Sequence, residues 1–261
     1  MPKVWLITGS SRGLGRALAE SVLAHGDRLV ATARNPDQLA DLAKRYADRV
    51  RTVILDVTDE AAAERAVRTA IDAFGRLDVL INNAGYGNVN AIEDTSLAEF
   101  REQIETNLFG TIIMTKAAIP LMREQGSGHI VQFSSVGGRV GALGRAPYSA
   151  AKWGVEGFSE VLAKEVGPLG IKVKIVEPGG FRTDFAGVST VIREGRPVYD
   201  ATVGATARFQ RDFNGRQPGD PAKAAVAIVH IAGLSRDDVG FGCGALKVAV
   251  QNLTRHAASM F

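Results

Sequence analysis

Short apolar runs alternate with longer helical patterns along most of this chain, and this alternation limits the folds it can adopt. The strand-like runs are residues 3–7, 28–32, 51–55, 78–82, 128–134 and 171–176. The helical patterns are residues 14–25, 36–47, 59–74, 97–124 and 147–167. Strands that alternate with helices predict βαβ crossovers and a parallel sheet whose strands are buried on both faces. The chain is therefore expected to be an α/β protein with a doubly wound parallel sheet.

A glycine-rich turn follows the first apolar run and precedes a helical pattern. The turn reads Thr8-Gly9-Ser10-Ser11-Arg12-Gly13-Leu14-Gly15. Such a turn lets the backbone approach a pyrophosphate, and the helix N-terminus adds free N–H groups. Glycines often serve a turn alone, but their placement between a strand and a helix favours a dinucleotide site in a Rossmann sheet.

Tyr148 and Lys152 stand four residues apart in a helical pattern, with Ser135 upstream. Residues at this spacing share one helix face. A nearby ammonium favours the phenolate, so Lys152 is expected to lower the pKa of Tyr148. The pair would then exchange a proton with an alcohol or carbonyl oxygen held by Ser135. A tyrosine and a lysine on a solvated helix face are the alternative.

Composition narrows the class of protein. A chain of 261 residues suits a single domain, 1–261, and a net charge of +3 does not favour nucleic acid. A single cysteine, four separated histidines and no long apolar run predict no disulfide, metal site or membrane span. With no secretory signal in view, a cytoplasmic location is expected.

After Pro178 the alternation of strand-like and helical segments becomes irregular. Residues 184–219 resemble a long loop, which predicts a functional lid or a disordered segment. Its larger apolar residues are Phe185, Val191, Tyr199, Phe209 and Phe213, and its arginines are Arg193, Arg196, Arg208, Arg211 and Arg216. The aromatics predict a largely apolar substrate or a loop pinned to the core, and the arginines leave an acidic substrate group open. A helix at 221–234 and a strand near 239–242 are expected to close the fold.

With these motifs in view, residues 4–183 resemble the short-chain dehydrogenase/reductase family, in its compact branch of roughly 250 residues. The motifs are Thr8-Gly-x-x-x-Gly13-x-Gly15, Asn82-Asn83-Ala84-Gly85, Asn107, Ser135 with Tyr148 and Lys152, and Pro178-Gly179-Gly180-Phe181-Arg182-Thr183. Ser134 is one residue out of register with the serine of the family. The turn at 177–181 and the chain ending look like the 17β-hydroxysteroid-dehydrogenase-like subgroup.

The resemblance implies catalytic roles for Ser135, Tyr148, Lys152 and Asn107, the last holding a water near the lysine. It implies cofactor contacts at Gly9, Ser11, Arg12, Gly13, Leu14, Gly15, Arg34, Asp56, Val57, Asn83, Ala84, Gly85, Tyr148, Lys152, Pro178, Gly179, Phe181 and Thr183. Several of these have structural alternatives: Asn83 as a turn residue, Asn107 as a buried amide, and Asp56 or Thr183 as a helix cap.

The residues after the second strand bear on the choice of cofactor. NAD-binding sheets place a carboxylate there, whereas Ala33-Arg34-Asn35 has none. Arg34 can bind a 2′-phosphate through a fork of N–H donors, and Arg12 can approach the same group. The chain is therefore expected to use NADP(H), although Arg34 as a solvated turn residue is the alternative.

The function that the resemblance implies is hydride transfer between NADPH and a ketone or aldehyde, or the reverse alcohol oxidation. A non-catalytic NADP-binding redox sensor and a nucleotide-sugar lyase or epimerase are the alternatives. The partner would be a small carbonyl or alcohol molecule. The stretch 240–245 departs from the usual family ending, which puts a tetramer in doubt and leaves a homodimer open.

Overall fold

A seven-stranded parallel sheet forms the centre of the computed structural model, which describes residues 2–233 and 246–249. Its strand order is β3-β2-β1-β4-β6-β7-β9. The strands are β1 (Val4–Ile7), β2 (Arg28–Ala33), β3 (Val50–Ile54), β4 (Val79–Asn82), β6 (Gly128–Phe133), β7 (Ile171–Glu177) and β9 (Leu246–Ala249). The predicted doubly wound α/β fold is confirmed. The strand expected near 239–242 lies outside the described residues.

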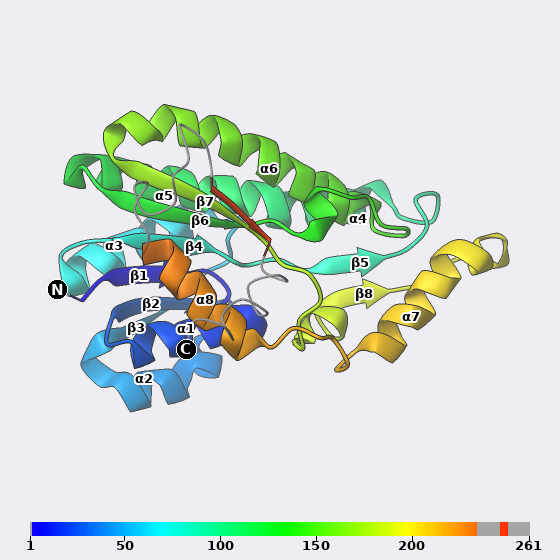
Figure 1. Cartoon of the computed structure of the whole chain (residues 1–261), viewed down its shortest axis with the longest axis horizontal. Helices are drawn as coiled ribbons and strands as arrows, with labels where there is room; N and C mark the ends of the chain where they lie inside the picture. Colours follow the sequence, from blue (N-terminus) through cyan, green and yellow to red (C-terminus); the bar gives the residue numbers. More distant parts are fainter. Residues whose placement is uncertain (1, 234–245, 250–261) are drawn as a thin grey trace.

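Helices cover both faces of the sheet (Figure 1). One face packs against α1 (Gly13–Ala24), α2 (Ala40–Tyr46) and α8 (Pro221–Gly233). The other packs against α3 (Glu60–Phe74), α5 (Gly110–Gln125) and α6 (Ala146–Val166). Among the described residues, no helix is both long and apolar enough to cross a membrane.

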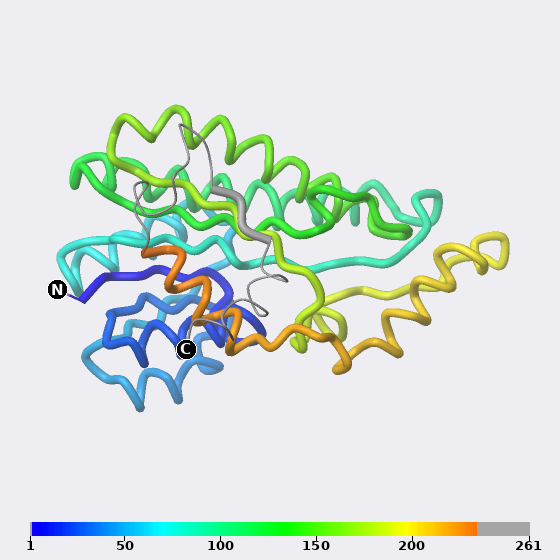
Figure 2. Tube along the Cα trace, in the orientation of Figure 1, coloured from blue at the N-terminus to red at the C-terminus, as the bar shows by residue number. Residues whose placement is uncertain are grey.

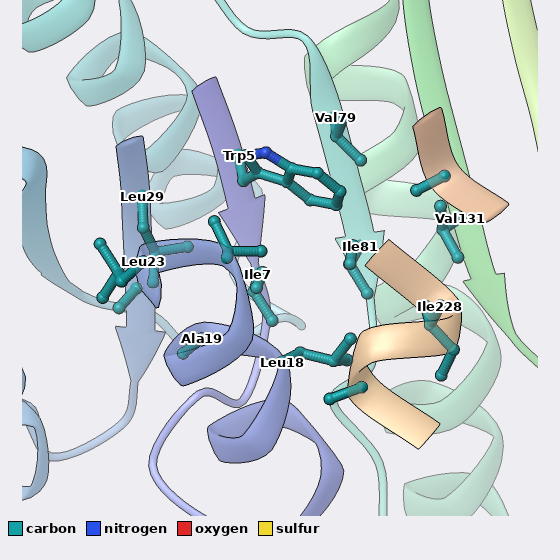
Figure 3. Close-up of a cluster of buried hydrophobic side chains, with 14 of the residues drawn as sticks. Trp5, Ile7, Leu18, Ala19, Leu23, Leu29, Val79, Ile81, Val131 and Ile228 are labelled. Carbon is teal, nitrogen blue, oxygen red and sulfur yellow. The ribbon is translucent and has the colours of Figure 1, made fainter. Parts of the chain in front are cut away.

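The alternation of side chains along β1 shows how the sheet supports two cores. Trp5 and Ile7 point to the α1 and α8 side, where they pack with Leu18 (Figure 3). Val4 and Leu6 point to the opposite face and belong to the second cluster. Successive residues of a strand face opposite sides, so a strand covered on both faces must be apolar throughout.

The segment predicted as one helix over 97–124 is interrupted. Helix α4 (Leu97–Ile104) gives way to a wider π-helical turn at Glu105–Phe109, and α5 follows. A π-turn admits an extra residue into the helix and is frequent at functional sites. The hydrophobic pattern alone does not show it. The turn contains Asn107, which is fully buried.

The prediction of a long loop over 184–219 is wrong. The segment contains β8 (Thr190–Ile192), which pairs in parallel with β5 (Gly87–Val89), and α7 (Ala205–Phe213). Figure 2 shows this part projecting from the main body of the fold. A strand of three residues is too brief to give a clear period, whereas the amphipathic pattern of α7 was present in the sequence and was missed.

Candidate active site

A cleft of about 1300 Å³ opens at the carboxyl ends of the strands, where α/β sheets bind their ligands. Every site residue predicted from the sequence lines it. These residues are Gly9, Ser11, Arg12, Gly13, Leu14, Gly15, Arg34, Asp56, Val57, Asn83, Ala84, Gly85, Asn107, Ser135, Tyr148, Lys152, Pro178, Gly179, Phe181 and Thr183. The fold thus brings together residues from almost the whole predicted sheet.

The glycine-rich turn is shaped by two backbone requirements. Gly13 has a φ of +58°, in the left-handed region that favours glycine. A Cβ at Gly15 would lie 2.1 Å from the carbonyl oxygen of Gly9, so only glycine fits there. The Asn83 amide donates to the carbonyl oxygens of Thr8 (2.9 Å) and Gly9 (3.2 Å). Asn83 therefore fixes the turn from the neighbouring strand.

Arg12 and Arg34 are both exposed at this end of the cleft. Within the described part of the chain, no hydrogen bond or ion pair engages either guanidinium. Asp56 accepts hydrogen bonds from the Thr58 N–H and hydroxyl groups, and the Thr58 backbone bond is the main reason why its pKa is lowered. Asp59, rather than Asp56, caps α3.

Ser135 and Tyr148 meet deep in the cleft. Tyr148 is buried, and burial raises the pKa of its phenol. The nearby Ser135 hydroxyl and the positive charge of Arg145 oppose that rise in pKa. Ser134 is also buried, but its Oγ has no hydrogen-bond partner within the described residues. Of the two serines, Ser135 therefore interacts with the phenol.

The expected lowering of the Tyr148 pKa by Lys152 is not found, because burial raises that pKa on balance and Arg145 is the cation that opposes the rise. The Lys152 ammonium donates to the Phe133 carbonyl oxygen at 2.7 Å and lies 5.8 Å from the centre of the Tyr148 ring. Burial lowers the pKa of Lys152 to about 8, against the opposing charge of Glu156.

Asn107 is held by protein groups on both sides of its amide. Its Oδ1 accepts from the Tyr86 N–H at 3.2 Å. Its Nδ2 donates to the Tyr86 carbonyl at 3.0 Å and to Gln103, whose side-chain oxygen lies at 2.9 Å. These bonds match the buried-amide interpretation and anchor the strand-end loop to the π-turn.

The turn after β7 forms the wall opposite the glycine-rich turn. The Pro178 carbonyl accepts from the Val136 N–H at 3.2 Å, and Phe181 is buried in the core. Thr183 caps the short turn that follows by accepting from the Phe185 N–H at 3.3 Å. Its capping role was one of the sequence alternatives.

Segment 184–219 contributes apolar side chains to the far end of the cleft. Phe185, Val191, Phe209 and Phe213 line it, whereas Tyr199 does not. The Phe185 ring centre lies 5.6 Å from that of Tyr148. None of the five arginines of this segment lines the cleft. Four of them form ion pairs with acidic residues: Arg193, Arg196, Arg208 and Arg211.

Sequence reasoning missed Arg145 and Gln210. Both line the cleft, and the Arg145 guanidinium donates to Gln210 Oε1. Their separation of 65 residues leaves no local signal. The proximity of Arg145 to the Tyr148 motif was the available hint.

Comparisons with known proteins agree with this geometry. A family profile described as short chain dehydrogenase matches residues 3–191. Oxidoreductase BOA17 of Botryotinia fuckeliana is 49% identical over 234 residues, covering 89% of this chain and 85% of that protein.

Two solved structures share the fold over nearly the whole chain. A short-chain dehydrogenase from Streptomyces avermitilis has a TM-score of 0.84 and 42% identity, over 99% of this chain and 94% of that one. An alcohol dehydrogenase from the archaeon Thermococcus sibiricus, complexed with 5-hydroxy-NADP, has a TM-score of 0.77 and 25% identity. That alignment covers 95% of this chain and 96% of the other.

Proposed function

This chain belongs to the short-chain dehydrogenase family, an oxidoreductase family acting on carbonyl and alcohol substrates, and from that premise we propose that it is an NADPH-linked ketone or aldehyde reductase. The same site would catalyse the reverse direction, in which the alcohol is oxidised. The observation that carries the proposal is the contact between Ser135 and the buried phenol of Tyr148 in a cleft that begins at a nucleotide-type glycine turn.

The residues present fit a dinucleotide. The close approach at Gly15 and the left-handed Gly13 leave the turn without side chains, so backbone N–H groups of α1 are free to meet a pyrophosphate. At the adenosine end, Arg12 and Arg34 form no ion pair among the described residues, and Ala33 stands where a carboxylate would favour NAD. These features support NADP(H), as does the NADP analogue bound by the archaeal relative.

The nicotinamide would supply the hydride, and the roles of the protein groups follow from their positions. Tyr148 donates the proton to the carbonyl oxygen as general acid. Ser135 orients that oxygen by hydrogen bonding. Lys152, buried beside the phenol, holds the cofactor ribose, and Asn107 fixes the loop next to it and supports proton exchange with solvent.

The substrate is proposed to have a largely apolar body. Phe185, Val191, Phe209 and Phe213 surround the far end of the cleft and would exclude water from the reacting carbon. The 17β-hydroxysteroid-dehydrogenase-like subgroup, a cytoplasmic location and a homodimer remain predictions.

A non-catalytic NADP-binding sensor is the second candidate. It would need Arg12 and Arg34 but not the Ser135–Tyr148 contact, which therefore favours the enzyme.

Two measurements test the proposal. Purified protein should oxidise NADPH with at least some members of a panel of ketones and aldehydes, which is measured as a fall in NADPH absorbance. If no member of the panel causes this fall, the reductase function is refuted. Titration should show tighter binding of NADPH than NADH, by about tenfold or more, because charge-assisted hydrogen bonds contribute roughly 1.5–3 kcal/mol each. Arg34→Asp should shift the preference toward NADH, and equal affinities in the unaltered protein would contradict the NADP assignment.

A further inference from the structure

Arg145 places a guanidinium in the substrate end of the cleft. It is the residue immediately before α6, and its Cζ lies 6.0 Å from the centre of the Tyr148 ring. A Cβ added at Gly87, on β5, would lie 3.5 Å from its Nη1. The side chain therefore lies between the proton donor and the β5–β8 wall.

No acidic side chain within the described residues forms an ion pair with Arg145. The hydrogen bond described for its guanidinium goes to the neutral amide of Gln210 on α7. Burial lowers its pKa, and Tyr148 is the group whose charge opposes that shift. The nearby arginines differ, since Arg193 pairs with Glu99 and Arg208 with Asp200.

The other cations of the cleft either are already hydrogen-bonded or lie far from Arg145. Lys152 is bound to the Phe133 carbonyl, and Arg12 and Arg34 lie at the opposite, nucleotide end. Phe185 lies on the same side as Arg145, since a Cβ added at Gly87 would be 3.2 Å from Phe185 Cζ and 3.5 Å from Arg145 Nη1, and both residues line the cleft. An anionic group in this part of the cleft would thus find one guanidinium in an environment that strengthens charge interactions.

We propose that Arg145 is a specificity residue that binds the carboxylate of a keto acid whose remaining body is apolar. The inference rests on the proposed reductase function and narrows its substrate class. A guanidinium binds a carboxylate through two parallel hydrogen bonds, which are stronger than its bond to a neutral amide. Gln210 would release Arg145 as the carboxylate binds, while the ketone oxygen meets Tyr148 and Ser135.

Binding of non-reactive analogues tests the site without turnover. Calorimetry in the presence of NADP⁺ compares phenylbutyrate with the neutral phenylbutyramide. The acid is expected to bind about 10- to 100-fold more tightly than the amide, as charged hydrogen bonds predict. Arg145→Gln should abolish that ratio. Arg211→Gln removes an arginine that lies outside the cleft and should preserve it. Equal affinities, or a ratio that survives Arg145→Gln, would overturn the proposal.

Gln210 supplies an independent variant that keeps the guanidinium. Gln210→Glu should pair internally with Arg145 and reduce the acid-to-amide ratio several-fold, and an unchanged ratio would count against the site. The kinetic counterpart compares NADPH oxidation with benzoylpropionate and its methyl ester, where the ratio of the two kcat/KM values should fall in Arg145→Gln. If neither ketone nor any other carbonyl is reduced while phenylbutyrate still binds through Arg145, the reductase function fails and the carboxylate site stands.

Discussion

The two ends of the cleft are built in different ways. At the nucleotide end, turns leave buried strands, and Asn83 ties the glycine turn to β4 through two hydrogen bonds. At the substrate end, β5, β8 and α7 pack on a small cluster of Val89, Ala91, Val203 and Ala207. The first end inherits the rigidity of the sheet, whereas the second depends on a satellite core.

Ion pairs at the substrate end do not give it the rigidity that the sheet gives the nucleotide end. Arg196 bridges Glu93 and Asp94, and Arg208 pairs with Asp200, but all of these groups are at least partly exposed. Exposed ion pairs contribute little net stability, because solvent screens them and side-chain entropy opposes them. Segments with few buried apolar contacts open at lower free energy than the core, as substrate lids must. The substrate end is therefore the adjustable part of the site.

Tyr148→Phe should separate chemistry from binding at the boundary between the two ends. The variant removes the proton donor, and general acid catalysis is worth about 10²–10⁴-fold, so turnover should fall by that amount. Because the glycine turn and the arginines are untouched, NADPH affinity should stay near that of the unaltered protein. Steady-state kinetics and cofactor titration measure the two quantities, and full activity in a folded variant would refute the assignment.

The neighbouring serines provide the matched control for that experiment. Ser135→Ala removes the hydroxyl that contacts the phenol and should lower kcat strongly. Ser134→Ala removes a buried hydroxyl that has no hydrogen-bond partner within the described residues and should cost much less. The reverse result would move the catalytic serine to position 134.

Substitutions in the two regions should lower the free energy of unfolding by unequal amounts. Leu18 is fully buried in the core under β1, so Leu18→Ala should lower the free energy of unfolding by about 2–5 kcal/mol. Phe209 on α7 is 63% exposed and stacks on Phe213, so Phe209→Ala should cost less than about 1 kcal/mol. Urea denaturation measures both values, and similar losses would show that α7 is integral to the main core.

The same division explains what the sequence could predict. The glycine turn, Asn83 and the Tyr148–Lys152 pair lie at strand ends or on one helix, so local pattern located them and all line the cleft. The pairing of β5 with β8 and the bond between Arg145 and Gln210 join distant residues, and no local period encodes them. The expected direction of the Tyr148 pKa shift is wrong because spacing shows neither the burial of the phenol nor the bond from Lys152 to the Phe133 carbonyl.

Limited proteolysis tests whether the substrate end closes. With Phe185 against Tyr148 and Phe209 at the rim, ordering of segment 184–219 around a ligand should slow cleavage within it several-fold. The comparison is between free protein and protein with NADPH plus a competitive inhibitor, with cleavage sites identified by mass spectrometry. Equal rates within 184–219 would remove the lid interpretation, and cleavage elsewhere serves as the internal reference.

The smallest expected effect concerns His129, a residue of the central sheet. It lies on β6 with Nδ1 3.2 Å from the Lys174 ammonium, and burial, followed by that charge, lowers its pKa to about 3. Between pH 6.5 and pH 3 the unfolded chain therefore binds a proton at this position that the folded chain does not, so His129 makes stability fall as the pH drops through this window.

His129→Gln should flatten this part of the dependence of stability on pH. His230→Gln changes an exposed histidine on α8 and should keep the original slope. Urea denaturation at a series of pH values measures these slopes, and an unaltered slope in His129→Gln would mean that His129 is protonated in the folded sheet.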